Sequence, residues 1–394
     1  MDRFGDKICC NPTVKLKKQE SYPVIDIDKI TPGYKAVRSV ASIEYTGQGG
    51  AKFQDHDVLF ARITPCLENG KMAIADTEGQ NGIGSTELFV FRGIDGVSDT
   101  DYVYYLLCMK HIRQLAANSM TGASGRQRAD LDFIKRIQWD FPDIEMQKKI
   151  ASVLSAYDNL IEVNNKRIKV LEQIAENLYK EWFVRFRFPG HEKADFENGI
   201  PKGWAYRRAD EVIDFNPTLK TGNQTEFTII PMEALSTNSM VLDSGCFVRQ
   251  DSISGRRSQN GDTLLAKITP CLENGKTGFV MGMPENEVLG GSTEFVVMRS
   301  KALTPHYVYC IARSYYFRQT AILSMNGADG RQRVDEDKLK STKILQPEKT
   351  VLDHFETIVT PIFDGVYQMV QENKNLIQQR DLLLPRLMSG KLEV

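Results

Sequence analysis

The chain has 394 residues, of which 41% are hydrophobic and 26% charged, as is ordinary for a soluble globular protein of two or three domains. Its 50 Lys and Arg residues balance 51 Asp and Glu residues, which excludes a strongly basic nucleic-acid coat protein but not DNA binding by local basic surfaces. No apolar run of about 18 residues predicts a membrane span and the N-terminus lacks a secretory pattern, so we expect a cytoplasmic protein.

A long internal repeat organises the chain. The segment Asp57–Lys71 returns as Asp262–Lys276, which is an offset of 205 residues (262 minus 57). The segment Gly122–Arg128 returns as Gly327–Arg333 at the same offset. Agreement at one offset across half a chain indicates a tandem duplication, and each copy is too long to be a solenoid repeat.

Within each copy, a β-rich stretch precedes a helical one. Residues 1–142 contain short apolar runs punctuated by Gly, Pro, Asn and Asp, which predicts strands, with one helix over residues 101–117. Residues 143–186 then predict a first long helix, because Glu145–Phe183 contains no Gly and no Pro. The pattern then repeats. Residues 187–347 predict a linker and a second β-rich domain, with one helix over 305–324. Residues 348–394 predict a second long helix and a C-terminal tail.

Apolar residues seven apart in both long helices predict an a/d seam. We favour pairing of the two helices over packing of each on its own domain, because the spacing is nearer 3.5 than 3.6 residues. Pro361 is expected to kink or break the second helix near Phe355–Thr360. Asn373 and Arg380 are expected to need polar partners such as Asn164. The predicted seam residues are Ile150, Leu154, Tyr157, Ile161, Ile168, Leu171 and Leu178 in the first helix, and Phe355, Val359, Ile362, Val366, Met369, Leu376 and Leu383 in the second.

The usual signatures of catalysis are missing from the sequence. It contains no phosphate-binding Gly-rich loop, no His-Glu-x-x-His and no Gly-x-Ser-x-Gly. None of the five histidines recurs at the offset, and seven cysteines without Cys-x-x-Cys spacing predict reduced thiols rather than disulfides or zinc. The duplicated carboxylates, Glu87 and Glu294 among them, are single in each copy, so we expect them to bond to backbone or a neighbouring arginine. No catalytic residue and no metal site is predicted.

The duplicated cationic and amide side chains favour a nucleic-acid contact. Arginine and glutamine can read base edges, and lysine, threonine and Gly-flanked backbone can hold phosphates. The expected DNA-binding residues are Arg62, Thr64, Asn69, Lys71, Arg126, Gln127 and Arg128 in the first copy, and Lys267, Thr269, Asn274, Lys276, Arg331, Gln332 and Arg333 in the second.

Two alternatives to that assignment stay open. Arg126 or Arg128 could form an ion pair with Asp130 or another carboxylate. The shared segments could also be scaffold, with the divergent stretches 25–55 and 230–260 reading the bases; the copies differ further at Arg62 against Lys267 and at Ser124 against Asp329.

The architecture resembles the specificity subunit of a type I restriction-modification system over nearly the whole chain. The resemblance is carried by the helix segments Phe141–Ile150 and Leu171–Phe183, by Gly199–Trp204 and by the C-terminal Arg380–Leu392. The first half lacks a counterpart of Ile200–Trp204.

The resemblance implies an α+β fold with two target-recognition domains, each followed by a long helix, the helices forming an antiparallel coiled coil with pseudo-twofold symmetry. It implies a non-catalytic subunit that reads two half-sites of double-stranded DNA separated by a fixed gap. It further implies two docked modification (methyltransferase) subunits and added restriction subunits. S-adenosylmethionine, ATP and Mg²⁺ would then bind the partners, and no cofactor this chain. The alternative is a stand-alone, non-enzymatic DNA-binding protein, or less favourably an enzyme with a cryptic site.

Overall fold

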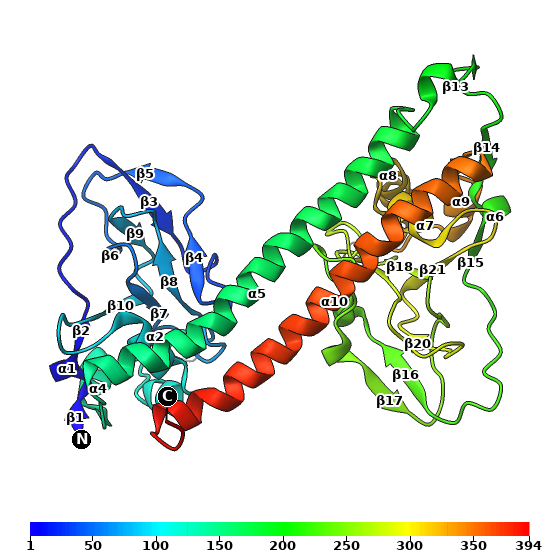
Figure 1. Ribbon diagram of the computed structural model, residues 1–394. Coiled ribbons are helices and arrows are strands. Elements are labelled where there is room, and N and C mark those ends of the chain that lie inside the picture. Colours follow the sequence, from blue (N-terminus) through cyan, green and yellow to red (C-terminus); the bar gives the residue numbers. More distant parts are fainter. Residues whose placement is uncertain (124, 329, 394) are drawn as a thin grey trace. The chain divides into compact units, whose positions relative to one another are not determined.

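The computed structural model describes residues 1–123, 125–328 and 330–393. These residues form two compact units. Unit 1 consists of residues 1–163 with 373–394, and unit 2 of residues 164–372. Both long helices therefore contribute a stretch to each unit, and each unit mixes sheets and helices (Figure 1).

Two small sheets form the centre of unit 1, in the orders β2-β10-β7-β8-β4 and β5-β3-β9-β6. Alternate residues of β7 enter different apolar clusters, with Phe60 on one face and Leu59 on the other, because side chains alternate across a strand. The strands are β1 Asp2–Arg3, β2 Ile8–Cys10, β3 Ser21–Ile25, β4 Ala36–Arg38, β5 Ser42–Glu44, β6 Ala51–Phe53, β7 Val58–Ala61, β8 Met72–Asp76, β9 Gly82–Gly84, β10 Leu88–Gly93 and β11 Gln138–Trp139.

Unit 2 follows similar strand orders, β15-β21-β18-β19 and β17-β16-β20, with one strand fewer in each sheet among the described residues. An additional hairpin of β12 and β13 opens its globular part and has no counterpart in unit 1 among the described residues. The strands are β12 Phe196–Glu197, β13 Ile200–Pro201, β14 Ala205–Arg208, β15 Ile213–Phe215, β16 Phe227–Ile230, β17 Val248–Gln250, β18 Thr263–Ala266, β19 Thr277–Phe279, β20 Gly290–Gly291, β21 Phe295–Ser300 and β22 Lys343–Gln346.

Among the described residues, four shorter α-helices accompany the sheets of each unit. Each of the two helices predicted over 101–117 and 305–324 is in fact two helices, broken at Met109 and Ser314. Both residues have extended backbone, and the Ser314 hydroxyl caps the following helix by accepting a hydrogen bond from Phe317 N at 3.3 Å. The helices are α1 Phe4–Lys7, α2 Thr100–Cys108, α3 Lys110–Asn118 and α4 Leu131–Arg136 in unit 1, and α6 Ala209–Val212, α7 Pro305–Arg313, α8 Tyr315–Leu323 and α9 Glu336–Ser341 in unit 2.

The long helices α5 (Ile144–Tyr179) and α10 (Lys349–Met388) run antiparallel within each unit. In unit 2, Asn164 donates to Glu372 at 2.8 Å and the Trp182 ring lies 5.8 Å from that of Phe355. In unit 1, Arg380 pairs with Asp158 at 2.5 Å. The predicted α+β fold with two paired long helices is confirmed.

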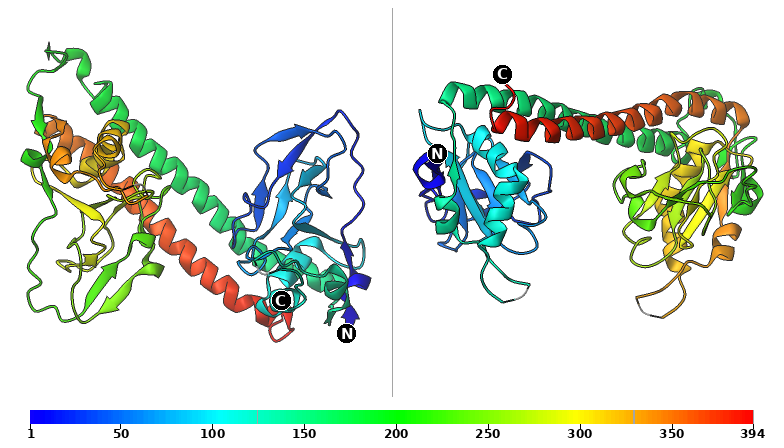
Figure 2. Two further views of the ribbon diagram at one scale, coloured as in Figure 1. Left: turned by 180° about the vertical axis from the view of Figure 1, so that it is seen from behind. Right: turned by 90° about the horizontal axis from the view of Figure 1, so that it is seen from below.

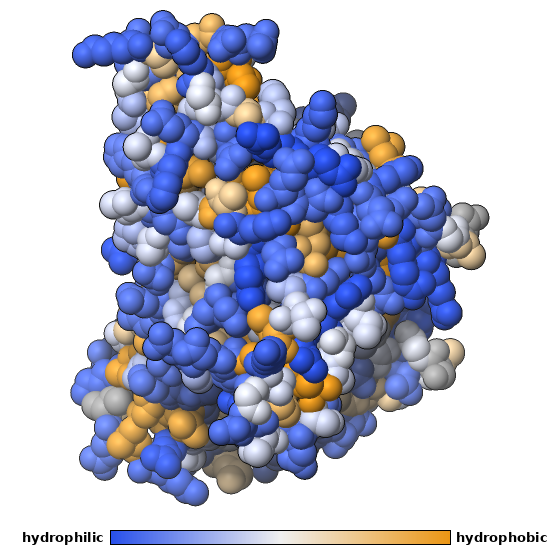
Figure 3. All heavy atoms as spheres, turned by 90° about the vertical axis from the view of Figure 1, so that its right-hand side faces the viewer, coloured by the Kyte–Doolittle hydropathy of each residue, from blue (hydrophilic) through white to orange (hydrophobic). Residues whose placement is uncertain are grey.

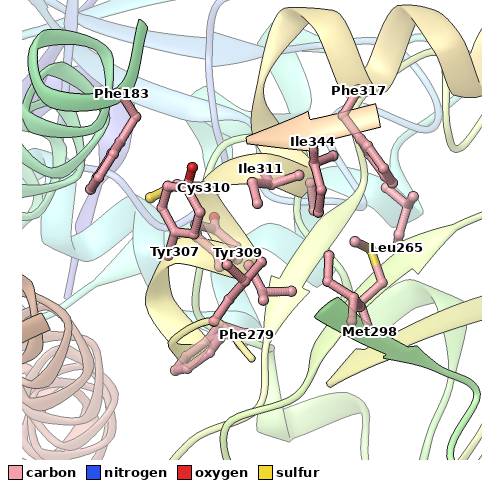
Figure 4. Packing of buried hydrophobic residues seen from close by; sticks show 14 of the residues in the cluster. Phe183, Leu265, Phe279, Met298, Tyr307, Tyr309, Cys310, Ile311, Phe317 and Ile344 are labelled. Atoms are coloured by element: carbon pink, nitrogen blue, oxygen red, sulfur yellow. The ribbon is translucent and has the colours of Figure 1, made fainter. Parts of the chain in front are cut away.

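The two packing alternatives for the long helices turn out to coexist. In unit 2, α5 and α10 share one apolar cluster with the helix α7. Figure 4 shows Phe183, in the π-helical turn Lys180–Val184 that ends α5, pointing towards Tyr307 of α7, with ring centroids 4.5 Å apart. In unit 1, Leu154 of α5 and Leu387 of α10 belong to the cluster that also holds α2. Each helix therefore packs on its partner helix and on a domain core.

No predicted seam residue is exposed, but the seam does not include every buried position of the two helices. Phe363 and Leu384 are buried although they fall beside the predicted seam. Phe363 contacts the rings of Phe279 and Tyr309, which come from the globular part of unit 2. The apolar face of α10 is broader than a two-helix seam because it covers a domain core as well.

The expected break of α10 at Pro361 is wrong. The helix runs unbroken through Pro361, which is exposed and lies between the buried Val359 and Phe363. On this exposed side, water can solvate the backbone carbonyl that proline leaves without an N–H donor. The expectation that Arg380 needs a polar partner is confirmed, because Arg380 pairs with Asp158, whereas Asn164 donates to Glu372.

The surface offers no large apolar region in the view of Figure 3, where hydrophilic side chains dominate and apolar ones form small separate groups. Within the described ranges, no helix combines the length and apolarity needed to cross a membrane.

Candidate nucleic-acid interface

The duplicated Gly-x-x-Gly-Arg-Gln-Arg segment forms a protruding hairpin in each unit. In unit 1, Thr121 and Arg128 exchange two backbone hydrogen bonds of 3.0 Å at its base. Gly122 and Gly125 have φ values of 122° and 81°, a backbone region that glycine adopts at little cost. Within its own unit, the hairpin projects from the side opposite the long helices (Figure 2).

The hairpin of unit 2 has the same construction. Asn326 and Arg333 exchange two backbone hydrogen bonds of 2.8 Å, and Gly327 and Gly330 have φ values of 126° and 79°. The expected difference between Ser124 and Asp329 lies outside the described residues.

The predicted threonines hold the hairpins in place. Thr64 N donates to Gln127 O at 3.0 Å, and Gln127 N donates back to the Thr64 hydroxyl at 3.1 Å. Thr269 and Gln332 repeat this pair of bonds at 3.1 and 3.2 Å. These hydroxyls are therefore used within the fold, as anchors of the hairpin backbone.

One arginine of each hairpin forms a forked ion pair. Arg128 donates from two nitrogens to Glu87 at 2.9 and 2.6 Å, and Arg333 does the same to Glu294 at 3.0 and 2.7 Å. The hydrogen bond from the arginine holds the pKa of each carboxyl below its usual value. The expectation that Glu87 and Glu294 bond to a neighbouring arginine is confirmed.

The other arginine of each hairpin is open to solvent. Arg126 and Arg331 are exposed, and among the residues that the structure describes neither side chain has a hydrogen-bond or ion-pair partner. The amide side chains of Gln127 and Gln332, half-buried beside them, are likewise unengaged within the described chain. Each hairpin thus presents one uncompensated positive charge and one amide.

The Thr-Pro-Cys-Leu-Glu-Asn-Gly-Lys segment forms a tight turn beside each hairpin. Its lysines face inward, because Lys71 donates to Ile27 O at 2.9 Å and Lys276 to Met232 O at 3.1 Å. Asn69 and Asn274 are exposed on the same turns.

Two further arginines, Arg113 and Arg318, lie beneath these turns and were missed by sequence reasoning. A Cβ on Gly70 would come within 2.3 Å of Arg113, and one on Gly275 within 2.9 Å of Arg318. Both arginines recur at the offset of 205 (318 minus 113), a signal that the sequence did contain.

The two copies also differ at Arg62 and Lys267. Arg62 lies over the ring of Phe89, with 4.9 Å between the guanidinium carbon and the ring centroid. Lys267 instead forms an ion pair with Glu336 at 2.9 Å. The structure therefore gathers the predicted residues around the hairpins, but engages many of them in the fold.

Comparison with known proteins finds similarity to one family. Residues 8–173 match the model of the type I restriction modification DNA specificity domain. The chain is 23% identical to the MjaVIII specificity subunit of Methanocaldococcus jannaschii, over 100% of this chain and 92% of that one. It is 25% identical to the MjaIX specificity subunit of that organism, over 77% and 72% of the two chains.

A solved structure agrees in fold. The S subunit of a type I restriction-modification system from M. genitalium superposes with a TM-score of 0.54 at 13% identity, over 98% of this chain and 94% of that one. The chain thus combines two copies of one domain and two long paired helices with sequence similarity along its whole length to specificity subunits of type I restriction-modification systems.

Proposed function

We propose that this chain reads a bipartite DNA target, with unit 1 contacting one half-site and unit 2 the other across a fixed gap. The observation that carries the proposal is the duplicated hairpin, which offers in each unit an exposed arginine and an adjacent amide. Arginine and glutamine pair with guanine and adenine edges in the major groove, and Gly-rich backbone can approach phosphates. Two such hairpins in one chain suit a recognition sequence of two separated parts.

The chain itself supplies recognition rather than chemistry in this proposal. Modification subunits would carry S-adenosylmethionine and methylate adenine, and restriction subunits would use ATP and Mg²⁺. No group of three His, Cys, Asp or Glu side chains among the described residues has metal-binding geometry. The proposal of a non-catalytic subunit rests on the family and on the missing motifs.

The long helices are the proposed docking surface for the two modification subunits. In the unit 2 part of α5, Val170 and Ile174 are exposed one turn apart, and in its unit 1 part Leu160 and Val163 are exposed three residues apart. Exposed apolar side chains at helical spacing, set among charged ones, are typical of surfaces that another protein covers.

The hairpin arginines give a direct test. Replacing Arg126 and Arg331 together by alanine should weaken DNA binding by the full complex, because two charges aimed at the duplex are lost. A base contact is worth about 1–3 kcal/mol at one sequence position, whereas a phosphate contact weakens all duplexes alike and lowers the salt dependence. Binding is measured by fluorescence anisotropy on target and unrelated duplexes at several salt concentrations.

Lys135 and Lys340 provide the matched control. They recur at the same offset and each already pairs with an aspartate, Asp132 at 3.0 Å and Asp337 at 3.1 Å. Their double alanine variant removes the same formal charge but should change affinity much less. If the hairpin variant and the wild type bind DNA with equal affinity at every salt concentration, the hairpins have a structural role only and do not contact DNA.

A further inference from the structure

A carboxylate neutralises the cation at the base of the hairpin in unit 2. Glu336 Oε1 accepts hydrogen bonds from Lys267 Nζ and from Arg256, both at 2.9 Å. Its second oxygen accepts from the Asn216 amide at 2.8 Å. Lys267, whose side chain is 14% exposed, is thus held inside a closed polar network.

The same network cannot form in unit 1. The offset of 205 places Leu131 where unit 2 has Glu336 (336 minus 205), and Ala51 where it has Arg256 (256 minus 205). Leu131 instead packs against the apolar cluster of unit 1. The equivalent of Lys267 is Arg62, which therefore has no matching carboxylate.

An aromatic ring supports Arg62 instead. Its guanidinium lies over Phe89, whose counterpart at the offset of 207 that applies to this strand is Val296 (296 minus 89). Stacking of this kind fixes the plane of a guanidinium while leaving its N–H edges available. Among the described residues, nothing accepts a hydrogen bond from this guanidinium, and its Nε is buried without a partner.

The nearby carboxylate of Glu87 does not take the place of Glu336. Both of its oxygens already accept from Arg128, although the charge of Arg62 contributes to the lowered pKa of Glu87. The Arg62 carbonyl accepts from Ala129 N at 2.8 Å, directly after the hairpin. The Arg62 guanidinium is therefore held in one orientation and has no hydrogen-bond acceptor among the described residues. It lies at the base of the hairpin that we propose contacts DNA.

We propose that Arg62 is a DNA-contacting residue of unit 1, pairing its N–H groups with two acceptor atoms of the duplex, whereas Lys267 is a structural residue of unit 2. The acceptors are either the O6 and N7 edge of a guanine or the oxygens of a phosphate. This inference rests on the proposed recognition function. If it holds, the two units contact DNA differently at the position of Arg62 and Lys267, although the duplication alone predicts the same contact in both.

Methionine substitutions test the asymmetry, because methionine keeps an unbranched stem over Phe89 and removes the charge. Arg62→Met and Lys267→Met are compared with the wild-type chain in complex with its modification subunits. The probes are a duplex carrying the sequence that the complex methylates and an unrelated duplex of equal length. Arg62→Met should bind the target at least about fivefold more weakly, and Lys267→Met within about twofold of the wild type. Thermal melting checks that both variants are folded.

Arg62→Lys separates the two acceptors. With a guanine contact, it should bind the target as weakly as Arg62→Met and bind unrelated DNA normally, because lysine lacks the fork. With a phosphate contact, it should bind nearly as the wild type, while Arg62→Met weakens both duplexes and lowers the salt slope by about one. Wild-type affinity of Arg62→Met, or an equal loss in Lys267→Met, would overturn the inference and leave the hairpin proposal standing. Absence of DNA binding by the wild-type complex would instead overturn the proposed function.

Discussion

Replacing Arg380 by alanine should lower the unfolding free energy of unit 1 by about 3 kcal/mol, because it leaves the charge of Asp158 buried and without its partner. The side chains of Arg380 and Asp158 are 11% and 5% exposed, and 2.5 Å separates the paired atoms. Burial by itself would lower the pKa of Arg380, but Asp158 and Asp381 raise it on balance. Tyr105 still donates to Asp158 at 2.5 Å, which keeps the loss near the lower end of the range for broken buried pairs.

Urea unfolding measures the loss of unfolding free energy. Hydrogen exchange of peptides from α2 reports on unit 1 and of peptides from α7 on unit 2, and thus shows which unit is destabilised. Combining Arg380→Met with Asp158→Asn, which keeps an acceptor for Tyr105, should recover part of the loss. Lys349→Ala breaks an exposed pair with Asp353 on the same helix, and should change stability by no more than about 0.5 kcal/mol. An Arg380→Ala variant as stable as Lys349→Ala would show that the buried pair contributes nothing.

Leu387→Ala should destabilise unit 1 by about 2–5 kcal/mol, although the residue lies near the C-terminus. Leu387 is 1% exposed and belongs to the apolar cluster of unit 1, together with Leu154 of α5. A leucine truncated at such a site loses both its buried methyl groups and the contacts of the surrounding side chains. The reduced protection should appear in α2 peptides by hydrogen exchange.

Leu382 on the same helix is the matched control for this substitution. Its side chain is 67% exposed, so Leu382→Ala should be nearly neutral for stability. If the two leucine variants unfold at the same urea concentration, the end of α10 is not part of the core of unit 1.

The long helices could be predicted from sequence because their signal is local. A seven-residue period indicated both elements, and the first also has no Gly or Pro over Glu145–Phe183. The predicted seam residues are all buried or half-buried. Phe363 escaped prediction because its partners, Phe279 and Tyr309, come from distant strands and helices. The effect of Pro361 was misjudged because tertiary packing on both sides outweighs one lost hydrogen bond.

The site was only partly predictable, because charge pairing depends on distant residues. The duplication revealed the hairpins and their glycines. Sequence could not show that Arg128 meets Glu87, 41 positions away, or that Lys267 meets Glu336, 69 positions away. Arg62 and Lys267 are both cationic, yet only Lys267 pairs with a carboxylate, and only the fold distinguishes a neutralised cation from a free one.

The central claim is that this chain determines a two-part DNA target, and adenine methylation across a genome tests it most directly. The chain is expressed with its modification subunits in a bacterial host that lacks adenine methylation, and the methylated positions are mapped by long-read sequencing. We expect one motif of two short specific parts separated by a fixed number of unread bases, lost when this chain is omitted. A single uninterrupted motif, or the same motif in the absence of this chain, would contradict the account.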